Sequence, residues 1–209
     1  MSDNLTRARN RRGEGARLRD EIVAAAVELL DETGDESSIS LRSVARRVGI
    51  AAPSIYRHFP DQPSIMLAVV RQAFTELEAQ LRLAVAAVGD DDPRRRLFAV
   101  CDGYLDFAQE HPERYRTMFG GLWMPALEGT SLTEADLVAL GDGCLGLLRE
   151  VLDGCVAAGH ATSTDPAADT IALWLGLHGL AHQRSVTVAF PWPADIAQRM
   201  ITALAHLGD

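Results

Sequence analysis

A glycine turn between two short stretches of helical periodicity, at residues 40–59, is the feature that most constrains this chain. Behind Ser40, apolar residues recur at helical spacing, at Leu41, Val44, Ala45 and Val48. A serine in that position accepts hydrogen bonds from the unbonded N–H groups of a first helical turn. Gly49 ends the pattern, and Pro53 suits the start of a second helix, because its missing N–H would be unbonded there anyway. The segment predicts two short helices, the second running from about Pro53 to Phe59.

The second predicted helix, capped by Ala51 or Ala52, has an inner and an outer face. Ile55 and Phe59 stand four residues apart and should point inward. The outer face carries small or hydrogen-bonding side chains, namely Ser54, Tyr56, Arg57 and His58. Such side chains enter a major groove or bind the phosphates beside it, so the segment predicts a DNA-reading head.

The order and spacing of these residues resemble the tetracycline-repressor (TetR) family of bacterial regulators. An amphipathic helix over residues 16–30 precedes the pair, and the motif ends in Ile55-Tyr-Arg-His-Phe-Pro. The resemblance implies that the final Tyr and His hold phosphates, while the residues just before them touch base edges. It places the DNA contacts at Ser40, Arg42, Ala51, Ala52, Pro53, Ser54, Tyr56, Arg57, His58 and Gln62. Ala51 stands where the family often has a serine and Gln62 where it often has a lysine, so both should weaken binding to phosphates.

The basic residues are unevenly distributed. All of them are arginines, and residues 1–19 hold six against two acidic residues. A basic segment that is poor in apolar residues predicts a disordered arm at residues 1–15, which either contacts DNA or is an idle solvated tail. From residue 61 onward ten arginines stand against 20 acidic residues, so this portion carries −10, whereas the whole chain carries −9. Such a molecule presents its basic head to DNA.

Length and composition predict a chain that can bury one good core, or one core plus a small head domain. The 209 residues are 47% hydrophobic, yet no run approaches the roughly 20 apolar residues of a membrane span and no signal-peptide core is present. Three scattered cysteines suggest reduced thiols and a cytoplasmic location. We expect an all-α fold: an arm at residues 1–15, a three-helix helix-turn-helix DNA-binding domain at 16–62, and a helical bundle for ligand binding and dimerisation at 63–209.

Helices of the body are predicted between proline and glycine boundaries. Their expected ranges are residues 61–88, 93–110, 112–119, 132–158 and 193–207. The loop at 120–130 contains large apolar side chains and should fold back over the body. The long helix at 61–88 links head to body, and the family resemblance implies that it couples their conformations.

Another helix begins after Asp165 and is apolar on almost every side between Ile171 and Ala181. One face should pack on its own core and the other on a second subunit, which predicts a homodimer. Twofold symmetry suits palindromic DNA, because two recognition helices then meet successive major grooves. Within this helix, Trp174 and His178-Gly179 look like the Trp-His-Gly pattern of one TetR C-terminal subclass.

The body also carries aromatic, polarizable and hydrogen-bonding side chains on the helices that the TetR family uses to enclose ligands. These are Tyr104, Phe107, Tyr115, Met118, Phe119, Trp123, Met124, Trp174 and His178. Each has an ordinary core role as its alternative. The scarcity of charge along these helix faces favours a mainly apolar small-molecule effector, which His178 and Tyr104 would orient.

The sequence has no clear catalytic or metal motif. His178 and His182 have the spacing of a zinc pair but lack an apparent third ligand, and no Gly-x-Ser-x-Gly motif is present. We predict a ligand-responsive regulator without cofactor, metal or membrane contact, most simply a repressor that a small effector releases from palindromic operator DNA. Two alternatives stay open: an all-α ligand carrier or enzyme with a vestigial head, and a repressor without an effector.

Overall fold

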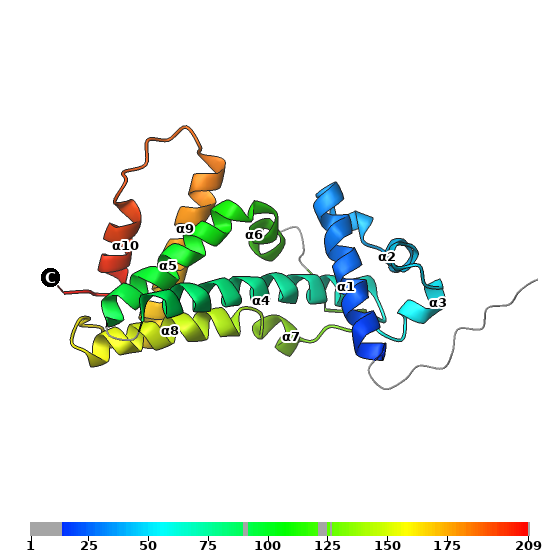
Figure 1. Cartoon of the computed structure of the whole chain (residues 1–209), viewed down its shortest axis with the longest axis horizontal. Helices are drawn as coiled ribbons and strands as arrows, with labels where there is room; N and C mark the ends of the chain where they lie inside the picture. Colours follow the sequence, from blue (N-terminus) through cyan, green and yellow to red (C-terminus); the bar gives the residue numbers. More distant parts are fainter. Residues whose placement is uncertain (1–13, 90–91, 121–124, 126, 209) are drawn as a thin grey trace, which may run out of the picture. The chain divides into compact units, whose positions relative to one another are not determined.

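The computed structural model describes residues 14–89, 92–120, 125 and 127–208, and its regular elements are helices (Figure 1). The prediction of an all-α fold is confirmed. In chain order the elements are α1 (Glu14–Thr33), the 3-10 helix η1 (Glu36–Ser38), α2 (Leu41–Val48), α3 (Ala52–Ile55), α4 (Gln62–Val88), α5 (Pro93–Glu110), α6 (Pro112–Phe119), α7 (Glu134–Val138), α8 (Asp142–Ala157), α9 (Pro166–Val186) and α10 (Ile196–Leu204).

The chain divides into two compact units. The first comprises Met1–Val69 and Leu122–Thr133, and the second comprises Val70–Gly121 and Glu134–Asp209. The boundary falls inside α4, so one continuous helix supplies residues to both units.

The first unit has a core built by α1, α2, α3 and the first turns of α4. Its largest wholly buried side chains are Ile22, Ile39, Val44, Ile55, Phe59 and Ile65. The guanidinium of Arg19 lies 4.8 Å from the ring centroid of Phe59, a cation–π contact that joins α1 to the segment after α3. The core thus holds α2 and α3 in place from behind.

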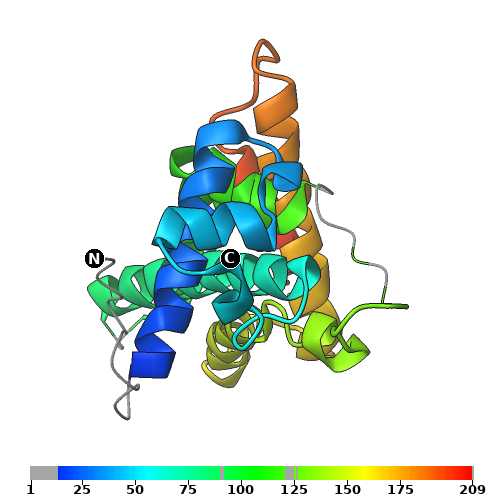
Figure 2. The same cartoon turned by 90° about the vertical axis from the view of Figure 1, so that its right-hand side faces the viewer.

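The second unit is a helical bundle. Within it α5 packs on α8 and α9, and α9 packs on α10. In both views the connection between α9 and α10 projects beyond the ends of these two helices (Figures 1 and 2). A Cβ on Gly176 would lie 2.6 Å from Cδ1 of Leu204, so glycine permits the close approach of α10 to α9.

One prediction about the body is wrong. The helix predicted over residues 132–158 is two helices, α7 and α8, because Gly141 adopts a φ of 82° just before α8. The loop at 120–130 stays a prediction, because Leu122, Trp123 and Met124 lie outside the described residues. Residues 127–130 belong to the first unit, and next to them the backbone N–H of Ser131 donates to Asp61. The ranges predicted at 93–110 and 112–119 match α5 and α6.

Candidate nucleic-acid interface and effector pocket

A capping box begins the helix-turn-helix. The backbone N–H of Ser43 donates to Oγ of Ser40 (3.1 Å), and the backbone N–H of Ser40 donates to Oγ of Ser43 (2.8 Å). At the other end of α2, Gly49 has a φ of 74°, and its N–H donates to the carbonyl oxygen of Arg46. Few other residues adopt this left-handed conformation without strain, so the glycine sets the turn into α3.

The helix α3 is shorter than predicted. It ends at Ile55, and the N–H groups of His58 and Phe59 both donate to the carbonyl oxygen of Ile55 at 2.9 Å, which forms a tight turn. Phe59 is buried and precedes Pro60, and a residue before proline is disfavoured in helical conformation. The predicted helix from Pro53 to Phe59 is therefore wrong beyond Ile55.

A polar surface remains exposed around α3. Tyr56 is 55% exposed and Arg57 is also exposed, whereas Ile55 and Phe59 are buried as predicted. Of the predicted DNA contacts, Ser40, Arg42, Ala51, Pro53, Tyr56, Arg57 and Gln62 are exposed, and Ala52, Ser54 and His58 are half-buried. No ion pair between described residues restrains Arg42 or Arg57. Their guanidinium groups are therefore available to an external anion.

Two of these predicted residues also have contacts within the protein. Ser40 uses its oxygen to cap α2, and Nε2 of Gln62 donates to the carbonyl oxygen of Glu36 at 3.4 Å. A hydroxyl that already accepts a hydrogen bond can still donate one to a phosphate.

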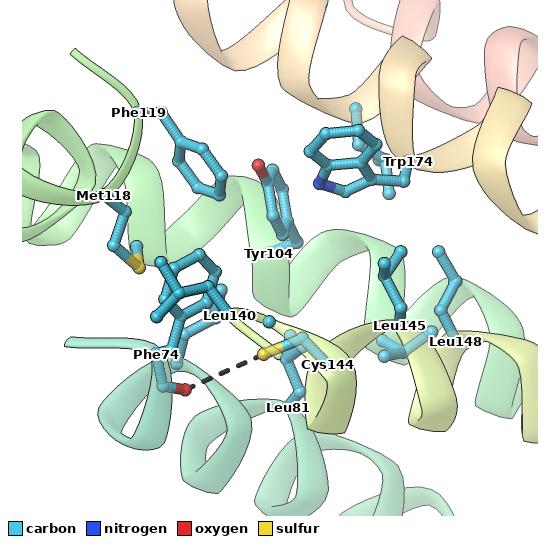
Figure 3. A pocket seen from close by; sticks show the side chains of 14 residues that line it. Phe74, Leu81, Tyr104, Met118, Phe119, Leu140, Cys144, Leu145, Leu148 and Trp174 are labelled. Atoms are coloured by element: carbon cyan, nitrogen blue, oxygen red, sulfur yellow. Dashed lines mark hydrogen bonds between the residues drawn. The ribbon is translucent and has the colours of Figure 1, made fainter. Parts of the chain in front are cut away.

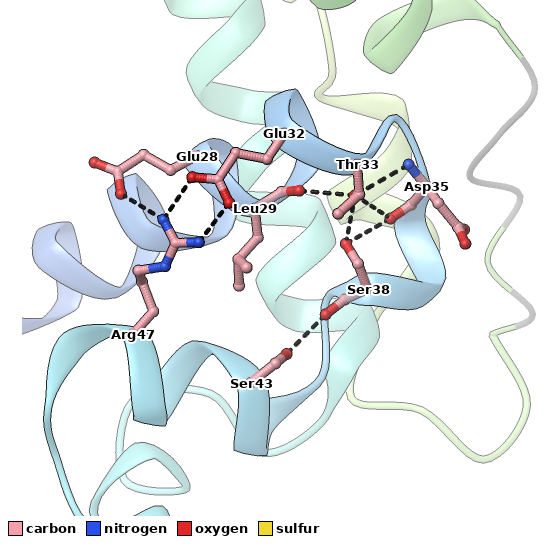
Figure 4. Close-up of polar contacts among 8 residues, drawn as sticks. All are labelled: Glu28, Leu29, Glu32, Thr33, Asp35, Ser38, Ser43 and Arg47. Carbon is pink, nitrogen blue, oxygen red and sulfur yellow. Dashed lines mark hydrogen bonds and ion pairs between the residues drawn. The ribbon is translucent and has the colours of Figure 1, made fainter.

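Arg47, which the sequence did not single out, fixes α2 against α1 (Figure 4). Its Nη1 lies 2.9 Å from Oε1 of Glu32 and 3.3 Å from Oε2 of Glu28, and its Nη2 also binds Glu32. The hydrogen bonds from Arg47 lower the pKa of Glu32. At the next turn, Thr33 Oγ1 donates to the carbonyl oxygen of Leu29 at 2.8 Å. Spacing along the chain does not show which helices a charged side chain joins, so this arginine had no sequence signal.

Asp61 joins the start of α4 to the segment before α7. Its Oδ1 accepts hydrogen bonds from the N–H of Ser64 (2.9 Å) and from Oγ of Ser131 (3.0 Å), and its Oδ2 accepts one from the N–H of Ser131 (2.6 Å). Partial burial by itself would raise the pKa of this carboxyl, but the hydrogen bonds outweigh burial and lower the pKa. Asp61 thus caps the start of α4 and also binds the segment around Ser131, which is distant in the sequence.

The second unit contains an apolar pocket of about 250 Å³. It is lined by Phe74, Leu77, Leu81, Val100, Tyr104, Met118, Phe119, Leu140, Gly141, Cys144, Leu145, Leu148, Trp174 and Leu177. Figure 3 shows the rings of Tyr104, Phe119 and Trp174 gathered along one side of this space, with Cys144 and Leu145 opposite. The Cys144 thiol lies 3.7 Å from the carbonyl oxygen of Phe74, to which it donates. The pocket is mainly a hydrocarbon and aromatic surface with few polar atoms.

His178 lies beside the pocket in a cluster of aromatic rings. Its Nδ1 is 2.7 Å from the hydroxyl oxygen of Tyr115 and 3.4 Å from that of Tyr104. The imidazole stacks on Trp174 with 5.8 Å between ring centroids. Burial lowers the pKa of His178, and the neighbouring His182 lowers it further. Burial also raises the pKa of both tyrosines, so the cluster is uncharged at neutral pH.

The predicted effector residues divide into three groups. Tyr104, Met118, Phe119 and Trp174 line the pocket, whereas Phe107, Tyr115 and His178 do not. Trp123 and Met124 lie outside the described residues. The sequence missed the aliphatic lining, for example Leu81 and Leu148, because a leucine beside a pocket has the same pattern as a leucine in a core.

Two family profiles match the chain. "Bacterial regulatory proteins, tetR family" matches residues 22–69, and "Tetracyclin repressor-like, C-terminal domain" matches residues 97–207, which is more than half of the chain. The chain belongs to the tetR family. It is therefore a DNA-binding transcription regulator with a helix-turn-helix domain, and most of the residues that match the C-terminal domain of that family belong to its second unit. The Trp-His-Gly subclass stays a prediction.

Relatives of this tetR-family regulator include named transcription factors. The chain is 29% identical over 133 residues to "HTH-type transcriptional activator FasR" of Mycolicibacterium smegmatis. This alignment covers 57% of this chain and 59% of that protein. It is 28% identical over 115 residues to "HTH-type transcriptional regulator BetI" of Pseudomonas aeruginosa, over 54% of this chain and 57% of that protein. The chain thus spans little more than half the length of the curated relatives it matches.

Solved structures share the fold over nearly the whole chain. A protein of unknown function from Rhodococcus sp. RHA1 aligns with a TM-score of 0.69 and 22% identity, covering 98% of this chain and 95% of that chain. FadR from Bacillus subtilis, in complex with stearoyl-CoA, aligns with a TM-score of 0.65 and 14% identity, covering 89% and 97%. At these identities the similarity establishes the fold of the tetR-family chain and nothing about its ligand.

The described residues contain neither a candidate metal site nor a candidate membrane-spanning helix. They contain no group of three or more His, Cys, Asp or Glu residues placed to hold a metal ion. Among the helices formed by the same residues, none has the length and apolar character to cross a membrane.

Proposed function

We propose that this tetR-family chain is a ligand-responsive repressor that binds palindromic operator DNA as a homodimer and is released by a small, mainly apolar effector. In this proposal residues 1–15 form a basic arm, residues 16–62 bind DNA, and residues 63–209 bind the effector and dimerise. The observation that carries the proposal is the combination of an exposed polar face around α3 with an apolar pocket in the second unit.

The DNA contacts are assigned to the exposed side of α2, α3 and the following turn. Tyr56 is 55% exposed and suits a phosphate contact, while Arg57 suits bidentate recognition of a guanine edge. Ser54 and Pro53 lie one turn earlier, where side chains approach bases in a helix-turn-helix. In contrast, Arg47 is already bound to two carboxylates of α1 and supports the reading surface from within the first unit.

A second copy of the chain is expected to cover α9. Ile171 and Leu175 are four residues apart on this helix and are 44% and 55% exposed, although the opposite face carries the buried Leu173 and Leu177. Aliphatic side chains this exposed, on a helix that is almost wholly apolar between Ile171 and Ala181, favour a subunit interface. Leu175→Glu should therefore give a monomer in light scattering, whereas Leu83→Glu, at a 72% exposed position of α4, should stay dimeric.

Coupling between effector and DNA is assigned to α4. Ile65 and Val69 of this helix belong to the first core, and Leu77 and Leu81 line the pocket. An effector that binds one position of α4 more tightly would change the fraction of dimers whose two DNA-binding domains have the spacing that the operator requires. By linkage, operator DNA would then weaken effector binding by the same factor.

The test is a fluorescence-anisotropy measurement of binding to DNA duplexes from the region upstream of the chain's own gene. Scrambled duplexes are the control, and the binding is repeated over a range of salt concentrations. The proposal expects specific binding by two protomers per site, or a multiple of two, with affinity that falls steeply as salt rises. Equal weak binding to both duplexes, together with ligand binding or turnover, would instead favour a carrier or enzyme with a vestigial head. Because the relative FasR is named an activator, a reporter gene under the operator is needed to decide whether binding represses or activates transcription.

A further inference from the structure

The pocket in the second unit lacks charge. Among the described residues that line it there is no aspartate, glutamate, arginine or histidine, and the residues with polar side-chain atoms are Tyr104, Cys144 and Trp174. Burial raises the pKa of Cys144 to about 12 and also raises the pKa of Tyr104, so both groups stay neutral at physiological pH. An ionised ligand group would leave water there without gaining a counter-charge, which is strongly unfavourable.

Two charged side chains of an adjoining depression already have partners. Arg71 and Glu78 line a separate, more polar depression that shares Phe74, Leu140, Gly141 and Cys144 with the pocket. Arg71 lies 2.7 Å from Asp136, and Glu78 lies 2.8 Å from Arg82. A ligand anion that paired with Arg71 or Arg82 would have to compete with the carboxylate already bound there.

The volume of the pocket suits a compact molecule. An engineered cavity of about 150 Å³ holds benzene, and pockets for drug-sized ligands begin at about 300 Å³. At about 250 Å³, this pocket lies between the two. A long acyl chain joined to a nucleotide, such as the stearoyl-CoA bound to FadR from Bacillus subtilis, is far larger than this space.

The walls favour an aromatic ligand. Phe74 and Phe119 meet edge to face with 5.5 Å between ring centroids, and Phe119 and Trp174 are 6.3 Å apart at an angle of 51°. These rings and that of Tyr104 come from four different helices and line the space shown in Figure 3. A flat ring placed among them gains further edge-to-face and stacking contacts.

We propose that the pocket binds a neutral aromatic molecule of one or two fused rings, with a single hydrogen-bonding substituent that faces the Tyr104 hydroxyl. The inference rests on the proposed function only in treating the pocket as the effector site. Binding itself requires no DNA and is measured on the free protein.

The first experiment titrates the full chain with two probes of the same ring system, 2-naphthol and 2-naphthoate. The structure predicts that 2-naphthol binds at least tenfold more tightly, because only the carboxylate brings a charge. Cys144→Phe should weaken 2-naphthol binding at least tenfold by filling the pocket. Val138→Phe adds the same ring at a 70% exposed position outside the lining and should leave binding unchanged.

A second experiment tests the role of Tyr104 without relying on a large substitution. Tyr104→Phe removes only the hydroxyl, so 2-naphthol should bind about fivefold more weakly, the effect of one lost hydrogen bond. Naphthalene, which has no substituent, should bind both proteins equally. An equal loss for both probes would overturn the assignment of Tyr104.

The neutral-ligand proposal is overturned if 2-naphthoate binds as tightly as 2-naphthol, or if stearoyl-CoA binds and 2-naphthol does not. Failure of the proposed function has a different signature. Selective 2-naphthol binding by a protein without specific DNA affinity would refute the regulator and support the ligand class. Specific DNA binding without any 2-naphthol binding would support the regulator and refute the ligand class.

Discussion

Replacing Asp61 by alanine should destabilise the first unit more than the loss of an ordinary helix cap. Removing a cap costs about 1 kcal/mol of the free energy of unfolding. Asp61 also accepts two hydrogen bonds from Ser131, at 2.6 and 3.0 Å. Hydrogen bonds to a charged group contribute about 1.5 kcal/mol each when buried, and half-burial reduces this value. Together the losses give about 2–3 kcal/mol.

The assay is urea unfolding followed by circular dichroism. With a slope of about 2 kcal/mol per molar urea, the transition of the first unit should move down by about 1–1.5 M. Because the chain has two units, two transitions are to be fitted separately. Asp165→Ala is the matched control, since Asp165 caps α9 through the N–H of Ala168 and belongs to the second unit. If Asp61→Ala lowered the free energy of unfolding no more than Asp165→Ala, the hydrogen bonds to Ser131 would contribute nothing to stability and the reasoning would be refuted.

Three further predictions concern stability. Ser40→Ala should cost about 1 kcal/mol in urea unfolding by removing the capping box of α2, and an unchanged midpoint would contradict that role. Gly141→Ala should destabilise by about 1–2 kcal/mol, because φ is 82° and the new Cβ would lie 3.0 Å from the ring of Phe74. Gly146→Ala, in open space within α8, should instead stabilise by up to about 1 kcal/mol, and equal effects of the two would refute the argument. The lowered pKa of His178 means that the unfolded chain binds a proton first, so stability should fall as pH drops below about 6.5 until the lower, folded-state pKa is passed. His178→Gln should reduce this pH dependence, as measured by urea midpoints at pH 7.5 and 5.5.

The helix-turn-helix was predictable because each of its signals is local. Ser40 as a cap, Gly49 as a left-handed end and Ile55 as an inward residue need only their neighbours along the chain. The end of α3 was less predictable, because the inward spacing of Ile55 and Phe59 continues past the last helical residue, Ile55. The proline after Phe59 disfavours helical conformation there.

The body was predictable in its helices but not in its contacts. Long apolar periodicity gave α5 and α6 directly, whereas Gly141, whose left-handed conformation separates α7 from α8, had the sequence pattern of a glycine inside a helix. The pairing of Arg47 with α1 and of Asp61 with Ser131 joins residues 15 to 70 positions apart. Such contacts depend on how helices pack, which periodicity does not encode.

The pocket shows the same limit for function. Aromatic side chains such as Tyr104, Phe119 and Trp174 were expected near a ligand, and they line the space. The closely related expectation for Phe107 was not met, since its ring packs in the core beside His111 with 5.1 Å between ring centroids. Composition alone does not tell which aromatic ring on a helix faces a cavity.

The central claim is that the exposed surface around α3 reads DNA sequence, and Arg57→Ala tests it most directly. The measurement is the ratio of affinities for operator and scrambled duplexes, by fluorescence anisotropy, for the wild type, Arg57→Ala and Tyr56→Phe. The account predicts that Arg57→Ala lowers this ratio by about tenfold or more, equivalent to about 1–3 kcal/mol. Tyr56→Phe should weaken binding to both duplexes equally, as expected for a phosphate contact. An unchanged ratio and unchanged affinities for both variants would contradict the assignment of this surface to DNA.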